Sequence, residues 1–319
     1  MKPRIYSTRE LPPEVISELK RRFRLDWNRR DRPVTRRELL QAVDGAEGLI
    51  TMLNDSIDAA VMAAAPKLRI IANYAVGYNN IDVVAASRRG IDVTNTPGVL
   101  TEATADLTWA LILATARRLH EGEALVRSGR WTGWAPTQLV GGEIYGKTIG
   151  IIGMGRIGQA VARRAQGFAM DIIYHSRNRL PLIKEVVLGA RYQSLKTLLH
   201  EADVVTLHLP LTNESRHVIG QEALQWMKPT AYLINTARGP VVDEKALLKA
   251  LARKQIAGAG FDVYEEEPRV PAALRRLNNV VLLPHLGSAA RETRVQMGMM
   301  VIDNLAARFA GHEPPNKVN

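Results

Sequence analysis

Residues 148–158 read TIGIIGMGRIG, an apolar run that passes directly into three glycines spaced as G-x-G-x-x-G. The run TIGII is typical of a buried strand, and apolar side chains recur at helical spacing after the glycine loop. A strand, a glycine loop and a helix in this order form the context in which the motif binds the pyrophosphate of a dinucleotide. We therefore expect this segment to open a Rossmann-type unit.

The residues of this loop have separate roles in the expected site. Gly153 permits a tight turn, Gly155 lets the backbone approach the pyrophosphate, and Gly158 lets the helix pack closely on the strand. Free N–H groups at the start of the helix favour an anion, which adds Arg156 and Ile157 to the predicted cofactor-binding residues. Three glycines can also form a simple turn, but the flanking strand and helix favour the dinucleotide site.

The turn after the next predicted strand, residues 171–175, bears on the identity of the dinucleotide. An NAD site usually has Asp or Glu here to bind the ribose 2′-hydroxyl. This sequence instead has Ser176, Arg177, Asn178 and Arg179. A hydroxyl and guanidinium groups would bind a 2′-phosphate, which a carboxylate would repel. We predict NADP(H) as the preferred cofactor, with NAD(H) as the weaker alternative and a solvated basic turn as the interpretation without a ligand.

Short β-rich runs alternate with helical segments along the whole chain. Strands are predicted at residues 4–7, 48–52, 68–72, 91–94, 148–152, 171–175, 204–207, 231–235, 257–261 and 280–283. Apolar periodicity predicts helices that include 14–23, 101 to about 128, 243–253 with Asp243 as N-cap, and 291–309. This alternation indicates βαβ units and parallel sheets, and therefore an α/β fold.

The composition limits the classes of protein. Of 319 residues, 46% are hydrophobic and 24% are charged, which excludes a largely disordered chain. Because there is no cysteine, a disulfide scaffold and a thiolate metal site are excluded, and no metal site is predicted. No segment is apolar enough for a bilayer, and residues 1–6 lack the apolar region of a signal peptide. We expect a cytoplasmic protein without a membrane partner.

The net charge of +11 raises nucleic-acid binding as an alternative. The basic residues are scattered, however, and we interpret the densest run, residues 20–37, as a solvated helix face. No nucleic-acid recognition motif accompanies them. We therefore expect no nucleic-acid partner, and a basic surface that attracts an anionic cofactor and substrate.

Three polar residues follow apolar strand runs, where an open parallel sheet presents its ligand crevice. They are Arg238, Glu267 and His285. A cation can bind a carboxylate and polarise a carbonyl, an imidazole can protonate the developing alkoxide, and a carboxylate can orient and charge that imidazole. Each residue alone would more often be a surface charge or a core histidine, but together they predict a 2-keto acid reductase.

The full set of motifs resembles the D-isomer-specific 2-hydroxyacid dehydrogenase family, and within it the glyoxylate/hydroxypyruvate reductases. The resemblance extends over nearly the whole chain. It is carried by NYAVGYNNID (73–82), the glycine loop, LHLPLT (207–212), NTARG (235–239), residues 262–268 and PHLGS (284–288). The order and spacing of these motifs are far more specific than the glycine loop alone.

The resemblance implies that Arg238, Glu267 and His285 are catalytic. It implies that the Val76 and Gly77 amides bind the substrate carboxylate, with Leu53 and Trp134 also at the substrate. Further residues implied to line the cofactor groove are Leu209, Pro210, Thr236, Ala237, Asp262 and Gly287.

The resemblance also implies two Rossmann-like, doubly wound domains. The substrate domain would be discontinuous, formed by residues 1–99 and 289–319, and residues 100–288 would form the dinucleotide-binding domain. Members of the family are typically homodimers, with the long helix and the following loop at the contact. Trp134 resembles the tryptophan that reaches towards the partner's active site in related reductases, and a simple interface anchor is the alternative.

The sequence therefore predicts NADPH-preferring reduction of small 2-keto acids, glyoxylate to glycolate and hydroxypyruvate to D-glycerate, with His285 as the general acid. The first alternative is a D-2-hydroxyacid dehydrogenase of broader specificity that uses NAD. The second is a dinucleotide-sensing protein similar to the corepressors related to this family.

Overall fold

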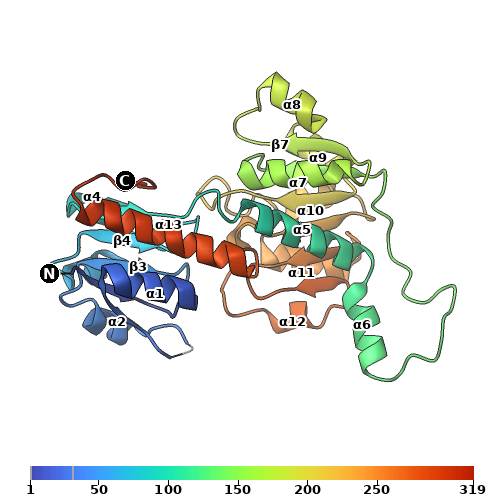
Figure 1. Ribbon diagram of the computed structural model, residues 1–319. Helices are drawn as coiled ribbons and strands as arrows, with labels where there is room; N and C mark the ends of the chain where they lie inside the picture. Colours follow the sequence, from blue (N-terminus) through green and yellow to red (C-terminus); the bar gives the residue numbers. More distant parts are fainter. Residues whose placement is uncertain (1, 31) are drawn as a thin grey trace. The chain divides into compact units, whose positions relative to one another are not determined.

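The chain divides into two compact units, Met1–Leu100 with Ser288–Asn319, and Thr101–Gly287. The computed structural model, which describes residues 2–30 and 32–319, shows a parallel sheet covered by helices in each unit (Figure 1). The predicted fold class, two doubly wound α/β domains of which one is discontinuous, is confirmed.

The first unit has a five-stranded sheet in the order β2-β1-β3-β4-β5. Its strands are β1 (Arg4–Ser7), β2 (Arg24–Trp27), β3 (Gly48–Thr51), β4 (Ile70–Asn73) and β5 (Asp92–Thr94). Its helices are α1 (Pro13–Arg22), α2 (Arg36–Ala42), α3 (Ala59–Ala63), α4 (Val83–Arg88) and α13 (Arg291–Phe309). One face of the sheet packs against α1 and α13, and the other against α2, α3 and α4.

The second unit has a seven-stranded sheet in the order β12-β11-β10-β9-β6-β7-β8. Its strands are β6 (Thr148–Ile152), β7 (Asp171–His175), β8 (Ala190–Tyr192), β9 (Val204–Leu207), β10 (Tyr232–Asn235), β11 (Gly258–Phe261) and β12 (Val280–Leu282). Its helices are α5 (Thr101–Ala116), α6 (Leu119–Arg127), α7 (Arg156–Gln166), α8 (Leu182–Leu188), α9 (Leu195–Glu201), α10 (Gln221–Trp226), α11 (Glu244–Ala252) and α12 (Ala272–Arg275). Helices α5 and α7 cover one face, and α9, α10 and α11 cover the other.

The order of the strands explains where this unit can bind a ligand. Strand β6 lies between β7 and β9, and the chain leaves β6 towards one side of the sheet and returns to the other. The crevice of an open parallel sheet forms at this switch point, outside the carboxyl ends of the strands. The glycine loop follows β6, so the predicted dinucleotide motif lies at the switch point.

The predicted strands are confirmed within two residues at either end, but two strands are absent from the prediction. Strand β2 lies within the basic run 20–37, so the interpretation of that whole run as a helix face is wrong. Its side chains alternate between half-buried and exposed, which leaves little apolar signal. Strand β8 has three residues, too few to show a period, and forms an edge of its sheet.

The predicted continuous helix from 101 to about 128 is also wrong, because the chain breaks between α5 and α6. Arg118 adopts a left-handed φ of 53°. The carbonyl of Ala116 accepts a hydrogen bond from Gly142 N–H at 2.8 Å, where a continuing helix would use an N–H four residues on. A Cβ at Gly141 would lie 2.1 Å from the Ala116 oxygen, so glycine is needed for this approach. Contact with a distant segment therefore ends the helix. No helix among the described residues is long and apolar enough to cross a membrane.

Gly158→Ala is expected to destabilise the protein. A Cβ at this position would lie 2.2 Å from the Gly153 carbonyl oxygen, a backbone atom that can move only with the whole loop. Overpacking of this kind typically costs about 1–3 kcal/mol of the free energy of unfolding, which urea denaturation measures. The matched control is Gly155→Ala, because a Cβ there meets no atom within 4 Å. Equal losses in the two variants would contradict this account.

Candidate active site

Strands β10, β11 and β12 are adjacent and in register, so the loops that follow them leave the same edge of the sheet. Asn235 pairs with Phe261, and Phe261 pairs with Leu282. Arg238 follows β10, Glu267 lies in the loop after β11, and His285 follows β12. Parallel pairing therefore gathers three segments that are distant in the sequence.

His285 and Glu267 contact each other directly. The distance from His285 Nδ1 to Glu267 Oε2 is 2.8 Å, and the side chains are 26% and 28% exposed. The other carboxylate oxygen of Glu267 accepts a hydrogen bond from Tyr264 N–H at 3.1 Å. Burial acts to raise the pKa of Glu267, but its bond to His285 and the charge of that residue hold the pKa below its usual value. Glu267 is therefore ionised at neutral pH and faces the His285 ring as a carboxylate.

Arg238 is the third member of this group. Burial lowers the pKa of its guanidinium, and the negative charge of Glu267 acts against that shift. Its Nη1 donates to the Ala237 carbonyl at 2.7 Å. The turn before it is fixed by Asn235, whose amide donates to the Arg238 carbonyl and accepts from Ala237 N–H, each at 3.0 Å. The structure thus places a cation, an imidazole and a carboxylate in one electrostatic group.

Asp262 determines where His285 lies. Its carboxylate accepts hydrogen bonds from Leu286 N–H at 2.6 Å and Gly287 N–H at 2.8 Å, and its carbonyl accepts from His285 N–H at 2.9 Å. His285 itself has a left-handed φ of 57°. Burial raises the pKa of Asp262, and the two N–H groups and the His285 charge oppose that shift. The residue expected in the cofactor groove thus has a carboxylate that holds the loop after β12.

Gly239 lets two of these loops approach each other. A Cβ at this position would lie 1.9 Å from both the carbonyl carbon and the carbonyl oxygen of Tyr264. Any side chain at Gly239 would displace the peptide between Tyr264 and Glu265. This peptide lies in the loop that continues to Glu267. The motif NTARG contained this glycine, but its packing role depends on a segment that no local pattern identifies.

The glycine loop after β6 fits the dinucleotide that the sequence predicts. Gly153 has a φ of 97°, and a Cβ there would lie 2.5 Å from the His208 carbonyl oxygen at the end of β9. Gly155 precedes α7 and has open space where its Cβ would be, so a ligand can reach the backbone. The first turn of α7, with Arg156, Ile157 and Gly158, leaves helix N–H groups free for an anion.

The residues predicted to bind a 2′-phosphate, in the turn after β7, differ in whether they already have a partner within the protein. The guanidinium of Arg179 donates two hydrogen bonds of 2.9 Å to Glu185, a buried carboxylate that also accepts from the Tyr174 hydroxyl at 2.6 Å. Ser176 is half-buried, and Arg177 and Asn178 are exposed. Arg179 is therefore already paired with a carboxylate, whereas Ser176, Arg177 and Asn178 remain the polar groups available at this turn.

The remaining residues of the expected cofactor groove follow β9, β10 and β12. Thr236 is buried and its hydroxyl lies 2.9 Å from that of Thr108. Ala237 and Gly287 are buried, Leu209 is half-buried and Pro210 is exposed.

His208 is a second imidazole at this edge of the sheet, and the sequence reasoning did not single it out. Its Nε2 lies 3.0 Å from the Thr206 hydroxyl. Burial lowers the pKa of His208 to about 3. The ring is therefore neutral at physiological pH and does not compete with His285 as a proton donor.

The expected substrate-binding residues come from both units. Those of the first unit lie in loops after β3 and β4, and Trp134 belongs to the second unit. Leu53 is in a loop held by Asp55, whose carboxylate accepts from Met52 N–H at 2.7 Å. Val76 and Gly77 follow β4 and are half-buried. Trp134 lies after α6 and is 82% exposed within the single chain.

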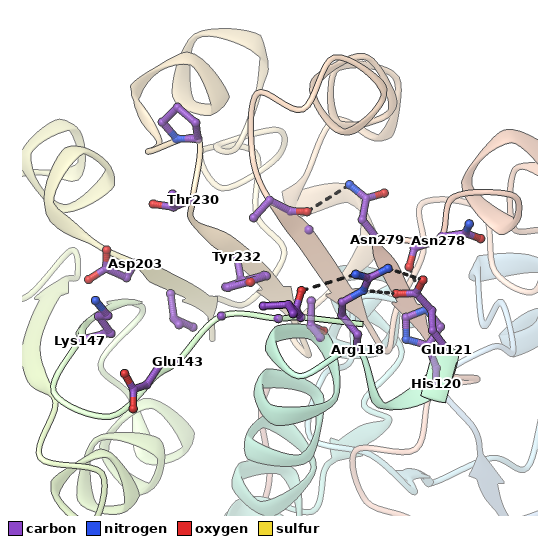
Figure 2. A pocket seen from close by; sticks show the side chains of 18 residues that line it. Arg118, His120, Glu121, Glu143, Lys147, Asp203, Thr230, Tyr232, Asn278 and Asn279 are labelled. Atoms are coloured by element: carbon purple, nitrogen blue, oxygen red, sulfur yellow. Dashed lines mark hydrogen bonds and ion pairs between the residues drawn. The ribbon is translucent and has the colours of Figure 1, made fainter. Parts of the chain in front are cut away.

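A cavity of about 600 Å³ lies at the opposite edge of the second unit's sheet, near the amino ends of β9, β10 and β11. Figure 2 shows side chains that line it, among them Lys147, Asp203 and Tyr232, and the ion pair between Arg118 and Glu121. Arg238, Glu267 and His285 follow the carboxyl ends of their strands and do not line it. The cavity is therefore separate from these three residues. No cluster of His, Asp or Glu among the described residues could hold a metal ion.

A family model described as D-isomer specific 2-hydroxyacid dehydrogenase, NAD binding domain, matches residues 109–287, which is more than half of the chain. The chain belongs to the D-isomer-specific 2-hydroxyacid dehydrogenase family. It is therefore an NAD(P)-dependent dehydrogenase, and the match lies within the unit that contains the glycine loop, Arg238, Glu267 and His285.

Similar members of the family cover the whole chain. The glyoxylate reductases of Thermococcus kodakarensis and Korarchaeum cryptofilum are 53% and 52% identical to it, over 100% of this chain and 97% and 96% of theirs. Among solved structures, an NADPH-dependent glyoxylate/hydroxypyruvate reductase from Sinorhizobium meliloti, in complex with NADP and malonate, is 38% identical with a TM-score of 0.88. That similarity covers 100% of this chain and 97% of the other.

Asp262→Asn is expected to lower the free energy of unfolding by about 1–3 kcal/mol, because the new amide turns an NH₂ group towards one of two buried N–H donors. The matched control is Asp243→Asn at the start of α11. Asp243 also accepts two N–H groups, but through one oxygen, which asparagine retains. Urea denaturation of both variants measures the difference, and equal stability would show that the two oxygens of Asp262 are not both needed.

Proposed function

We propose that this protein reduces small 2-keto acids, glyoxylate and hydroxypyruvate, to the corresponding 2-hydroxy acids with NADPH as the preferred cofactor. The observation that carries the proposal is the contact between His285 and Glu267 beside Arg238. The glyoxylate reductases of about 50% identity and the NADPH-dependent relative support the substrate class and the cofactor.

In the proposed mechanism, each of the three catalytic residues has one task. Arg238 polarises the carbonyl and contributes to holding the substrate carboxylate. His285, held by its ionised partner Glu267, donates a proton to the developing alkoxide oxygen. A nicotinamide dinucleotide held at the glycine loop would supply, when bound, the hydride for the carbonyl carbon. The Val76 and Gly77 amides of the first unit hold the substrate carboxylate, and Leu53 and Trp134 bound the substrate.

The cofactor would be held by residues at the carboxyl ends of the second sheet. The first turn of α7 and Gly155 bind the pyrophosphate, and Ser176 with Arg177 binds the 2′-phosphate. Arg179 contributes less to binding the 2′-phosphate, because its charge is already neutralised by Glu185. The buried residues Thr236, Ala237 and Gly287, with Leu209 and Pro210, form the wall of the groove.

Initial rates test the proposal directly. We expect turnover of glyoxylate and hydroxypyruvate with NADPH, slower turnover with NADH and poorer use of pyruvate. If none of these pairs turned over while the dinucleotide bound, a dinucleotide-sensing protein would be the better description. Faster turnover with NADH would favour the NAD-using dehydrogenase of broader specificity.

His285→Ala is expected to lower kcat for glyoxylate reduction by about 10²–10⁴-fold, because it removes the general acid. The matched control is His217→Gln. His217 also contacts a glutamate, Glu265, but that pair is not part of the proposed chemistry. Steady-state kinetics should show a change in kcat of less than about threefold in the control. A near-normal kcat in His285→Ala would show that His285 is not the general acid.

Arg177→Asp is expected to shift preference towards NADH. Loss of a charge-assisted hydrogen bond to the 2′-phosphate should lower the ratio of kcat/KM for NADPH over NADH by about tenfold or more. Arg191→Asp is the control, because it makes the same charge change on the neighbouring strand β8. If both variants changed the ratio equally, general surface charge would explain the preference and Arg177 would have no specific role.

We further propose a cytoplasmic homodimer. The absence of cysteine suits a reducing compartment. Trp131 and Trp134 are exposed large side chains in the segment after α6, as expected of residues that a second copy covers. Sedimentation of the protein and of Trp134→Ser would measure the assembly.

A further inference from the structure

The loop after β4 has three successive backbone carbonyls that accept hydrogen bonds. Thr96 N–H donates to the Ala75 carbonyl at 3.0 Å. Asn95 Nδ2 donates to the Val76 carbonyl at 2.8 Å, and Asn73 Nδ2 donates to the Gly77 carbonyl at 2.8 Å. Two buried asparagine amides therefore fix the orientation of consecutive peptide groups.

Peptide geometry determines what this does to the N–H groups. In a trans peptide the C=O of one residue and the N–H of the next point in opposite directions, and these peptides are trans. When the carbonyls of Ala75, Val76 and Gly77 face their donors, the N–H groups of Val76, Gly77 and Tyr78 face away from those donors. Within the described part of the chain, these three N–H groups donate no hydrogen bond.

The asparagines themselves are built into the first unit. Asn73 ends β4 and is fully buried, and Asn95 directly follows β5 and is 8% exposed. The adjacent strands β4 and β5 run parallel, so both side chains arise at the same edge of the sheet. An amide NH₂ can donate to a carbonyl, whereas a leucine or an aspartate of similar size cannot. The residue type therefore matters at both positions.

We propose that Asn73 and Asn95 are positioning residues for the substrate carboxylate, and that Tyr78 N–H joins Val76 and Gly77 N–H in binding it. The inference rests on the proposed function and deepens it. Three successive N–H groups that donate no hydrogen bond within the described part of the chain form an anion site that recognises a carboxylate without a charged side chain. The two asparagines hold that site in place and do not touch the substrate.

The test uses Asn95→Leu and Asn73→Leu in the full-length protein with saturating NADPH. We measure the dissociation constant of oxalate, a two-carbon dicarboxylate, by calorimetry, and KM and kcat for glyoxylate. The expected result is an increase of about tenfold or more in the oxalate constant and in KM, because the N–H groups lose their orientation. We expect kcat to change by less than about threefold, since uniform binding is lost, and NADPH affinity to be unchanged.

Asn28→Leu is the matched control. Asn28 Nδ2 also donates to two backbone carbonyls of the first unit, those of Thr8 at 3.2 Å and Arg32 at 2.8 Å, but holds no part of the loop after β4. It should lower the melting temperature without moving the oxalate constant. If Asn73→Leu fails to fold, Asn95→Leu and the nearly isosteric Asn95→Asp provide the same measurement. A folded Asn95 variant that binds oxalate within twofold of the wild type would overturn the proposal.

The two levels of inference fail in different ways. A protein whose oxalate affinity falls in the Asn95 variants, but whose wild type reduces no 2-keto acid, would support the carboxylate site and overturn the proposed function. If the wild-type protein reduces glyoxylate and the Asn73→Leu and Asn95→Leu variants have an unchanged KM, the proposed function stands and the positioning role is overturned.

Discussion

The carboxylate of Asp262 connects the ends of two neighbouring strands, and the contact between His285 and Glu267 depends on that connection. It accepts two N–H groups from the loop after β12, while its own carbonyl accepts the N–H of His285. Asp262 begins the loop after β11, which continues to Glu267, so this loop holds the backbone of the histidine and also supplies its carboxylate partner. A buried carboxylate is costly without hydrogen bonds, and these two N–H groups compensate for its burial.

Both units expose polar groups in the same way, at the strand ends of an apolar parallel sheet. Each sheet is parallel and covered by helices on both faces, so polar chemistry is confined to the loops at the strand ends. In the second unit these loops present charged side chains, and in the first unit they present backbone N–H groups. Asparagine recurs at the strand ends in both units, since Asn235 fixes the turn before Arg238 as Asn73 fixes the loop after β4.

Most of the fold could be predicted from the sequence because buried parallel strands are continuous apolar runs with clear ends. The bounds of β6, β7 and β9 match the predicted ranges. Prediction failed where the signal was not local. Helix α5 ends because Gly142 takes the carbonyl of Ala116, and nothing near Ala116 indicates that contact.

The same distinction applies to the candidate site. The residue types of Arg238, Glu267 and His285 indicated the chemistry, and the pairing of β10, β11 and β12 explains why they gather. The sequence did not show which polar side chains form ion pairs or hydrogen bonds within the protein. Arg179 is bound by Glu185, and the Asp262 carboxylate is used by a loop. Such pairings depend on the orientation of side chains from separate elements, which residue spacing alone does not determine.

The discontinuous first unit has a consequence for the order of events during synthesis. Helix α13 supplies Met297, Val301, Ile302 and Leu305 to the apolar layer that also contains Ile5, Ile50 and Ile70. When residues 1–100 leave the ribosome, one face of their sheet still lacks this helix. The second unit, by contrast, is continuous and complete before α13 is made. The nascent chain therefore carries a sheet face that only α1 covers until residues 291–309 are made, a state in which chaperone binding has a defined target.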